Sequence, residues 1–210
     1  MIDYGRICLE EVKNPERFDG NTDFVKDAVD YAVKKVWDVM GDFVHYHPSP
    51  SSTDLMYKQL LNTPEMLGGD WVGGFWTGML WLSYELTGNE VYRAVAEAQL
   101  EECVETPEAV WHHDIGFLYI PSSVAQYKLT GSQRAKKVSL KAAKLLAKRF
   151  CRNAGIIQVR NRNAQGDFII DCCMNVPLLF WASTMTQDRE YNYKAYSHLA
   201  QAIRCMVRDD

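Results

Sequence analysis

The chain has 210 residues, 23 Lys and Arg against 27 Asp and Glu, and 47% hydrophobic residues. This composition excludes collagen and intrinsic disorder. The net charge of −4 gives no excess of positive charge that would attract nucleic acid or an anionic membrane. The start lacks the features of a signal peptide, no apolar run reaches membrane-helix length, and six cysteines are scattered without a C-x-x-C pair. We therefore expect one cytoplasmic domain with reduced thiols.

Apolar residues spaced three or four apart predict a first helix over residues 23–40. The following segment, 41–69, is rich in Gly, Pro and Ser and is predicted to be mostly loop, with a short helix around Asp54–Leu61. Further along the chain, the apolar segments 156–160 and 168–170 are expected to pair as a small hairpin.

Beyond residue 70 the sequence repeats itself. The segment 82–99 aligns with 124–143, so that Leu-Thr-Gly at 86–88 matches Leu-Thr-Gly at 129–131, and a looser copy begins at Trp181. In each copy a helix stops at a Gly or Gln, and an Asn, Ser or Asp then caps the next helix. The repeated unit is a helical hairpin.

The two helices of each hairpin differ in charge. The first helices, expected over 71–86, 113–129 and 171–186, carry one or two charged residues each and are predicted to be enclosed on all sides. Their partners over 89–104, 132–152 and 189–208 carry at least five each. Alternating inner and outer helices predict an all-α fold, a helical toroid related to the solenoids.

Parallel inner helices would place their N-termini on one rim. Trp71, Phe75 and Trp76 would line this rim beside His112, His113 and Asp114 and beside Asp171 and Asn175. An aromatic wall and two carboxylates would meet there. A helix N-terminus lowers the pKa of an Asp, whereas burial and a second carboxylate raise it; if the raising effects are larger, one Asp can hold a proton and act as a general acid. The alternative is that both Asp side chains are ordinary N-caps.

Other candidate sites are weaker. His45, His47, His112 and His113 could ligate a metal, but adjacent histidines on a helix point apart and no Cys, Asp or Glu completes a known spacing, so no metal is expected. Cys172 and Cys173 are interpreted as core thiols. The glycines at 73, 74 and 78 favour close packing over a phosphate loop. A basic series on one helical face is interpreted as solvated: Arg134, Lys137, Lys141, Lys144, Lys148 and Arg152.

Three motifs resemble the unsaturated glucuronyl hydrolases: WVGGFWTGMLWLSYELTGN at 71–89, HHDIGFLY at 112–119 and IIDCCMNVPLLFWAS at 169–183. The resemblance runs from Asp23 to the last residue and implies an (α/α)6 toroid. About seven of its twelve helices would be present, so residues 1–210 would form one incomplete, N-terminal portion of the domain. The flanks of such a half-ring should expose apolar surface and could associate with another copy of the chain.

The resemblance also implies a reaction. The substrate would be an oligosaccharide derived from a glycosaminoglycan, with a C4–C5 double bond in its terminal uronic acid. Asp171 would protonate C4 and activate the water that attacks C5, and Asp114 would contact the ring and modulate the acidity of Asp171. Substrate-binding residues would be Trp71, Phe75, His113 and Asn175, with no metal or organic cofactor.

Two features leave the prediction open. Arg160 stands near the point where the family often has a Trp, and the family's later sugar contacts would follow residue 210. The alternatives are therefore a catalytically silent fragment or sugar-binding module, and an enzyme of the related unsaturated rhamnogalacturonyl branch.

Overall fold

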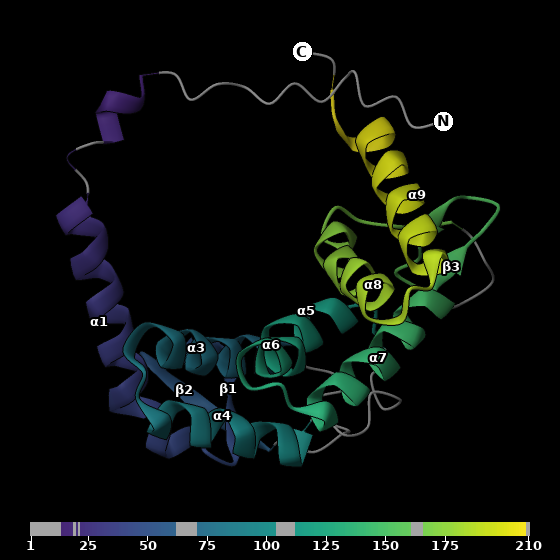
Figure 1. The fold of residues 1–210 in the computed structure, drawn as a ribbon. Coiled ribbons are helices and arrows are strands. Elements are labelled where there is room, and N and C mark those ends of the chain that lie inside the picture. Colours follow the sequence, from purple (N-terminus) through teal and green to yellow (C-terminus); the bar gives the residue numbers. More distant parts are fainter. Residues whose placement is uncertain are drawn as a thin grey trace.

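The computed structural model describes residues 14–18, 20, 22–61, 71–103, 112–160 and 166–208. Helices lie along an open arc in two layers (Figure 1). The inner layer contains α3 (Val72–Thr87), α5 (Ile115–Tyr119), α6 (Ala125–Thr130) and α8 (Cys172–Thr186). The outer layer contains α4 (Glu90–Cys103), α7 (Gln133–Lys148) and α9 (Arg189–Met206), and α1 (Thr22–Met40) stands at one end of the arc. The predicted alternation of inner and outer helices is confirmed.

The repeat has the helix ends that its sequence predicts. Gly88, Gly131 and Gln187 all have left-handed backbones, with φ of 68°, 71° and 60°, and each ends an inner helix. The following outer helices begin with side-chain caps: the backbone N–H groups of Val91, Ala135 and Glu190 donate to Asn89, Ser132 and Asp188. Each hairpin therefore closes through a left-handed residue and a polar cap.

The prediction of a short helix around Asp54–Leu61 is wrong. Strands β1 (Tyr46–Thr53) and β2 (Met56–Leu61) form an antiparallel hairpin instead. Asp54 and Leu55, the two residues of its turn, have φ of 52° and 65°. Positive φ at both positions matches the right-handed twist of the flanking strands, but Leu55 replaces the Gly that normally marks such a turn.

The second predicted hairpin pairs differently. Strand β4 (Ile156–Ile157) pairs with β3 (Phe150–Cys151), not with residues 168–170. Short 3₁₀ helices lie at Pro15–Phe18 and Gly41–Phe43. The inner helix expected over 113–129 contains a π-helical stretch, Ile120–Val124, between α5 and α6. Pro121 lacks the N–H that would continue the α-helical pattern, and the N–H of Ala125 donates to the carbonyl of Ile120, five residues back.

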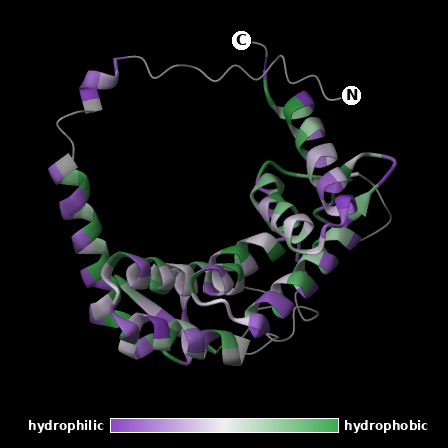
Figure 2. Ribbon diagram, viewed as in Figure 1, coloured by the Kyte–Doolittle hydropathy of each residue, from purple (hydrophilic) through white to green (hydrophobic). Residues whose placement is uncertain are grey.

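Two hydrophobic clusters form the core. The larger one lies among α5, α7, α8 and α9, and a smaller one joins the C-terminal part of α1 to α3 and α4. The inner helices are not enclosed on all sides, because α3 exposes Phe75, Met79, Leu82 and Leu86. Hydrophobic residues also alternate with polar ones along α1 (Figure 2), where Phe24 is 72% exposed. Exposed apolar surface at the flank is therefore confirmed, and association between copies stays a prediction. Within the described ranges, no helix combines the length and apolar character needed to cross a membrane.

Candidate active site

The site lies where the N-termini of α5 and α8 meet. The Asn175 side-chain oxygen accepts the backbone N–H groups of Gly116, at 2.6 Å, and Phe117, at 3.3 Å. These are N–H groups of the first turn of α5, which have no partner within their own helix. A Cβ on Gly116 would lie 2.4 Å from the Asn175 Cα, so only glycine permits this approach. The first turn of α8 thus caps α5.

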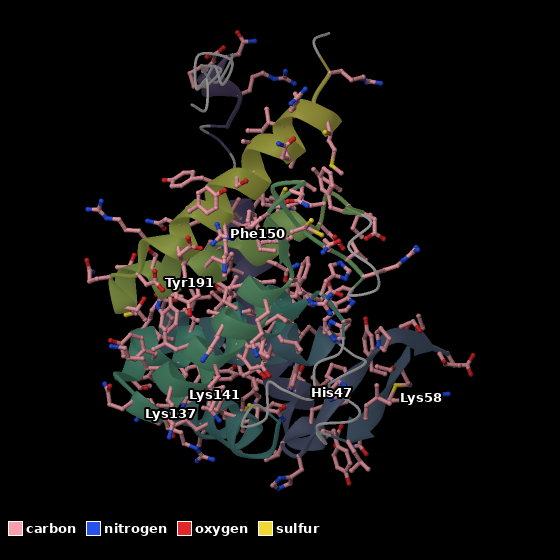
Figure 3. All side chains as sticks on the ribbon, turned by 90° about the vertical axis from the view of Figure 1, so that its right-hand side faces the viewer. His47, Lys58, Lys137, Lys141, Phe150 and Tyr191 are labelled. Atoms are coloured by element: carbon pink, nitrogen blue, oxygen red, sulfur yellow. The ribbon has the colours of Figure 1, made fainter. Side chains whose placement is uncertain are left out.

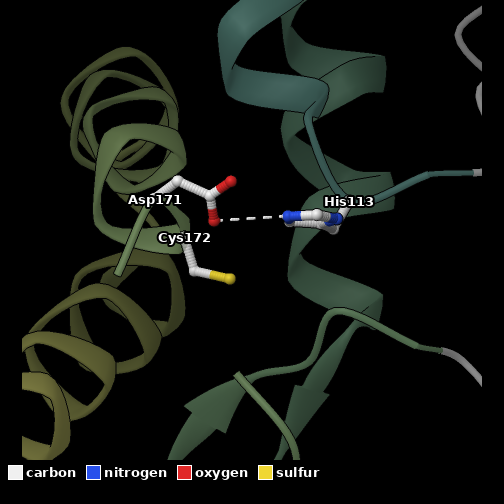
Figure 4. Close-up of side chains that lie close together, drawn as sticks. All are labelled: His113, Asp171 and Cys172. Atoms are coloured by element: carbon white, nitrogen blue, oxygen red, sulfur yellow. Dashed lines mark hydrogen bonds and ion pairs between the residues drawn. The ribbon is translucent and has the colours of Figure 1, made fainter. Parts of the chain in front are cut away.

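Two carboxylates lie beside this junction and share one histidine. His113 Nε2 is 3.4 Å from Asp171 Oδ1 (Figure 4) and 3.2 Å from Asp114 Oδ1. The Asp171 side chain is 39% exposed, whereas those of Asp114 and His113 are 11% and 12% exposed. Asp171 therefore faces solvent, and Asp114 forms the buried floor behind it.

Both aspartates occupy N-cap positions, but neither side chain makes a capping hydrogen bond. The N-cap alternative for these side chains is therefore wrong. The predicted divergence of the two adjacent histidines is wrong as well, because they lie in a turn before α5. The Asp114 N–H donates to His112 Nδ1 at 3.0 Å, and His112 Nδ1 lies 3.5 Å from Asp114 Oδ2. Both rings thus converge on Asp114.

Burial dominates the electrostatics of Asp114. Desolvation raises the pKa of this carboxyl, the nearby His113 and His112 lower it, and the charge of Asp171 raises it again. The buried Arg149 guanidinium also lowers the pKa of Asp114. Arg149 donates to the carbonyls of Gln158 and Val159, and its own pKa is lowered by desolvation. A buried cation therefore stands behind the carboxylate pair.

An aromatic wall adjoins the acid pair. Ring centroids of Trp71 and Phe75 lie 5.5 Å apart, and both rings pack against Phe117, at 5.4 and 5.8 Å. Trp71 and Phe75 are exposed, which suits stacking on a sugar face. Trp76 is buried and donates to the Phe43 carbonyl, so it belongs to the core. The prediction that the three inner N-termini meet at one rim is confirmed.

The thiol of Cys172 lies close to Asp171 and His113. One ligand atom each from His113, Asp171 and Cys172 lies within 4.8 Å of the others (Figure 4). His113 lies far from the other two residues in the sequence, which is why no known ligand spacing indicates the group. Burial raises the pKa of the Cys172 thiol to about 11 and also raises that of Cys173. Cys172 is a buried core thiol, as predicted, whereas Cys173 is only half-buried, so that part of the prediction is wrong.

The remaining predicted positions lie apart from the acid pair. Arg160 is exposed and pairs with Asp167 at 3.4 Å. The lysines of α7 line an open groove of about 450 Å³ on the outer surface, with Tyr191 of α9 on its other side. Lys137, Lys141 and Tyr191 lie together on this face (Figure 3). The interpretation of these lysines as a solvated face is confirmed.

Sequence reasoning missed two residues of the site. Phe117 completes the aromatic wall, and its position one turn into the helix after Asp114 was an available signal. Arg149 carried no signal, because it stands in a run of basic residues on an outer helix. Asn175 was predicted to bind substrate. Its oxygen caps α5, while its Nδ2 is buried and has no hydrogen-bond partner among the described residues, so substrate binding by Asn175 stays a prediction.

Known proteins resemble this chain in sequence and in fold. The chain is 36% identical over 216 residues to the unsaturated chondroitin disaccharide hydrolase of Streptococcus pyogenes serotype M1, covering 97% of this chain and 52% of that protein. The crystal structure of the unsaturated glucuronyl hydrolase from Streptococcus agalactiae superposes with a TM-score of 0.84 at 32% identity, covering 97% of this chain and 52% of that one.

A variant of the Streptococcus agalactiae enzyme in complex with dGlcA-GalNAc6S superposes with a TM-score of 0.76 at 30% identity, covering 97% of this chain and 50% of that one. The chain thus spans about half the length of the relatives that it matches. The sequence profile of glycosyl hydrolase family 88 matches residues 41–209. Together with the helical toroid and the paired carboxylates, this match shows that the chain belongs to glycosyl hydrolase family 88.

Proposed function

We propose that the protein hydrolyses oligosaccharides whose non-reducing end is a 4,5-unsaturated uronic acid. The observation that carries this proposal is the pair of carboxylates, Asp171 and Asp114, on either side of His113 and next to an exposed aromatic wall. Relatives that match nearly the whole chain are named for this reaction on unsaturated chondroitin disaccharide. The substrate is therefore an acidic disaccharide or short oligosaccharide derived from a glycosaminoglycan.

In the proposed mechanism, Asp171 is the general acid and base, because it is the solvent-facing member of the pair. It donates a proton to C4, the double-bond electrons form the new C–H bond, and positive charge develops at C5. The Asp171 carboxylate then accepts a proton from the water that attacks C5. The resulting hemiketal opens and the rest of the saccharide is released.

The neighbouring residues would hold the sugar and stabilise the charge. Trp71 and Phe75 pack on the sugar face, and His113 lies within reach of both carboxylates and of a ring hydroxyl. Asp114 contributes a buried negative charge that favours the positive charge developing at C5. No metal or organic cofactor enters this scheme. Free thiols at Cys151, Cys172, Cys173 and Cys205 are consistent with action in a reducing cytoplasm.

The decisive experiment follows the ultraviolet absorbance of the C4–C5 double bond during incubation with an unsaturated chondroitin disaccharide. We expect the absorbance to fall, and Asp171→Asn to slow this loss by about 10²–10⁴-fold with little change in KM. Asp38→Asn, which removes a surface carboxylate paired with Lys34, should leave the rate unchanged. Persistence of the chromophore with every unsaturated disaccharide would refute the proposal.

The same assay separates the alternatives. A sugar-binding module would show a higher thermal midpoint with saccharide but no loss of absorbance. An enzyme of the rhamnogalacturonyl branch would prefer the unsaturated rhamnogalacturonan disaccharide to the chondroitin disaccharide.

A further inference from the structure

We propose that a zinc-like divalent cation binds to His113, Asp171 and Cys172 and inhibits the protein. Ion binding follows from the geometry alone, whereas inhibition rests on the proposed function. Figure 4 shows the imidazole, the carboxylate and the thiol pointing into the same space from two different elements. His113 comes from the turn before α5, and the other two residues come from the start of α8.

The distances suit a small cation. The three ligand atoms lie within 4.8 Å of one another, and His113 Nε2 is already 3.4 Å from Asp171 Oδ1. Bonds of about 2.0–2.3 Å in a tetrahedron place ligand atoms about 3.5 Å apart. Because the gap between His113 and Asp171 is already this short, the widest gap involves the Cys172 sulfur, and closing it takes a shift of about 1 Å, within the reach of small side-chain rotations.

The ligand types select the cation. Imidazole and thiolate donors favour zinc and other thiophilic metals over magnesium and calcium, which prefer oxygen ligands. On binding, the Cys172 thiol releases its proton to solvent, and the imidazole supplies its Nε2 lone pair. Asp114 Oδ1, 3.2 Å from the same Nε2, adds a second negative charge near the ion. Three protein ligands leave a fourth position open for water.

Such an ion would occupy the catalytic carboxylate. A cation on Asp171 removes both the proton donor and the later base, and it keeps His113 from contacting substrate. Cys172 has no part in the proposed hydration of the sugar, so it can be changed without removing a catalytic group. This separation makes the proposal testable.

The first experiment measures inhibition of disaccharide hydrolysis by Zn²⁺. We expect inhibition that chelator reverses, no inhibition by Mg²⁺, and a rise of at least about tenfold in the inhibitory concentration for Cys172→Ala. Cys173→Ala is the matched control, because this neighbouring thiol lies 4.0 Å from His198 instead, and its sensitivity should equal that of the unchanged protein. Equal sensitivity in Cys172→Ala, or activation by Zn²⁺, would overturn the proposal.

A second measurement does not depend on activity. Co²⁺ added to the unchanged protein should produce a thiolate-to-cobalt charge-transfer band, which Zn²⁺ abolishes and Cys172→Ser lacks. The band would be expected even if no unsaturated saccharide were hydrolysed, so failure of the proposed function leaves the metal site testable. Absence of the band while Cys173→Ala and the unchanged protein remain folded would refute the site.

Discussion

Replacing Gly116 by alanine tests whether the contact between α5 and α8 sets the geometry of the acid pair. The added Cβ would lie 2.4 Å from the Asn175 Cα and 2.8 Å from its two oxygens. Contacts shorter than 3.0 Å do not persist, and ordinary contact begins near 3.4 Å. The two helices must therefore separate by about 1 Å at this point.

That separation has a cost that can be divided into two parts. Overpacking costs about 1–3 kcal/mol. The 2.6 Å hydrogen bond from Gly116 N–H to Asn175 would lengthen beyond bonding distance, which adds about 1 kcal/mol. Because Asp114 and His113 directly precede α5 whereas Asp171 precedes α8, the 3.4 Å gap between His113 and Asp171 should also widen. A displacement of about 1 Å in a catalytic group lowers turnover by about 10²-fold.

Two control variants separate stability from geometry. A Cβ on Gly78 would lie 2.7 Å from the Pro121 Cβ, so Gly78→Ala should also destabilise the fold while leaving the acid pair in place. A Cβ on Gly41 would meet nothing within 4 Å, so Gly41→Ala should be neutral. Thermal unfolding and disaccharide hydrolysis are measured for all three variants. A Gly116→Ala protein that loses no more activity than Gly78→Ala at equal stability would refute the reasoning.

Three further predictions concern single side chains. Asp114→Asn should abolish turnover, because it removes the buried negative charge beside Asp171. Burial raises the pKa of Asp114, so the ionised carboxylate lowers the stability of the fold increasingly as pH rises. Asp114→Asn should therefore raise the thermal midpoint at pH 7 by about 2–4 °C, and this gain should shrink in acid. Burial lowers the pKa of His198 from 6.5 to about 4, so between these pH values the unfolded chain binds a proton that the folded protein does not. The free energy of unfolding should therefore fall by up to about 3 kcal/mol as pH drops through this range. His198→Gln should flatten the dependence of the thermal midpoint on pH. Phe117→Ala removes the ring that supports Trp71 and Phe75 and should raise KM several-fold while kcat changes little. An unchanged KM would show that the aromatic wall does not bind the sugar.

The helical hairpins were predictable because their signals are local. A left-handed Gly and a capping Ser lie within three residues of the helix ends that they determine, as at Gly131 and Ser132. The β1–β2 hairpin was not predictable, because its turn uses Asp54 and Leu55 in left-handed conformations without a glycine. Leu55 is 92% exposed, so the pairing of Ser52 and Thr53 with Tyr57 and Met56, not a residue preference within the turn, holds the hairpin closed.

The candidate site was predictable in its residues but not in its contacts. Asp114 and Asp171 stand at the starts of weakly charged helices, and this position is visible in the sequence. The link between them is His113 Nε2, which lies 58 residues from Asp171 in sequence. Cys172 was interpreted correctly as a buried thiol, yet its proximity to His113 depends on how α8 packs against α5.

One packing contact accounts for several of these long-range relations. Asp171 and Asn175 are four residues apart at the start of α8, so they lie on the same side of that helix. The Asn175 oxygen holds the first turn of α5 through Gly116 and Phe117, which belong to the same short segment as Asp114 and the aromatic wall. Any shift of α8 that keeps this cap must therefore carry Asp171 along with Asp114 and Phe117. The acid pair and the aromatic wall consequently form one unit positioned by one glycine and one asparagine, which is why we expect a single methyl group at Gly116 to affect both.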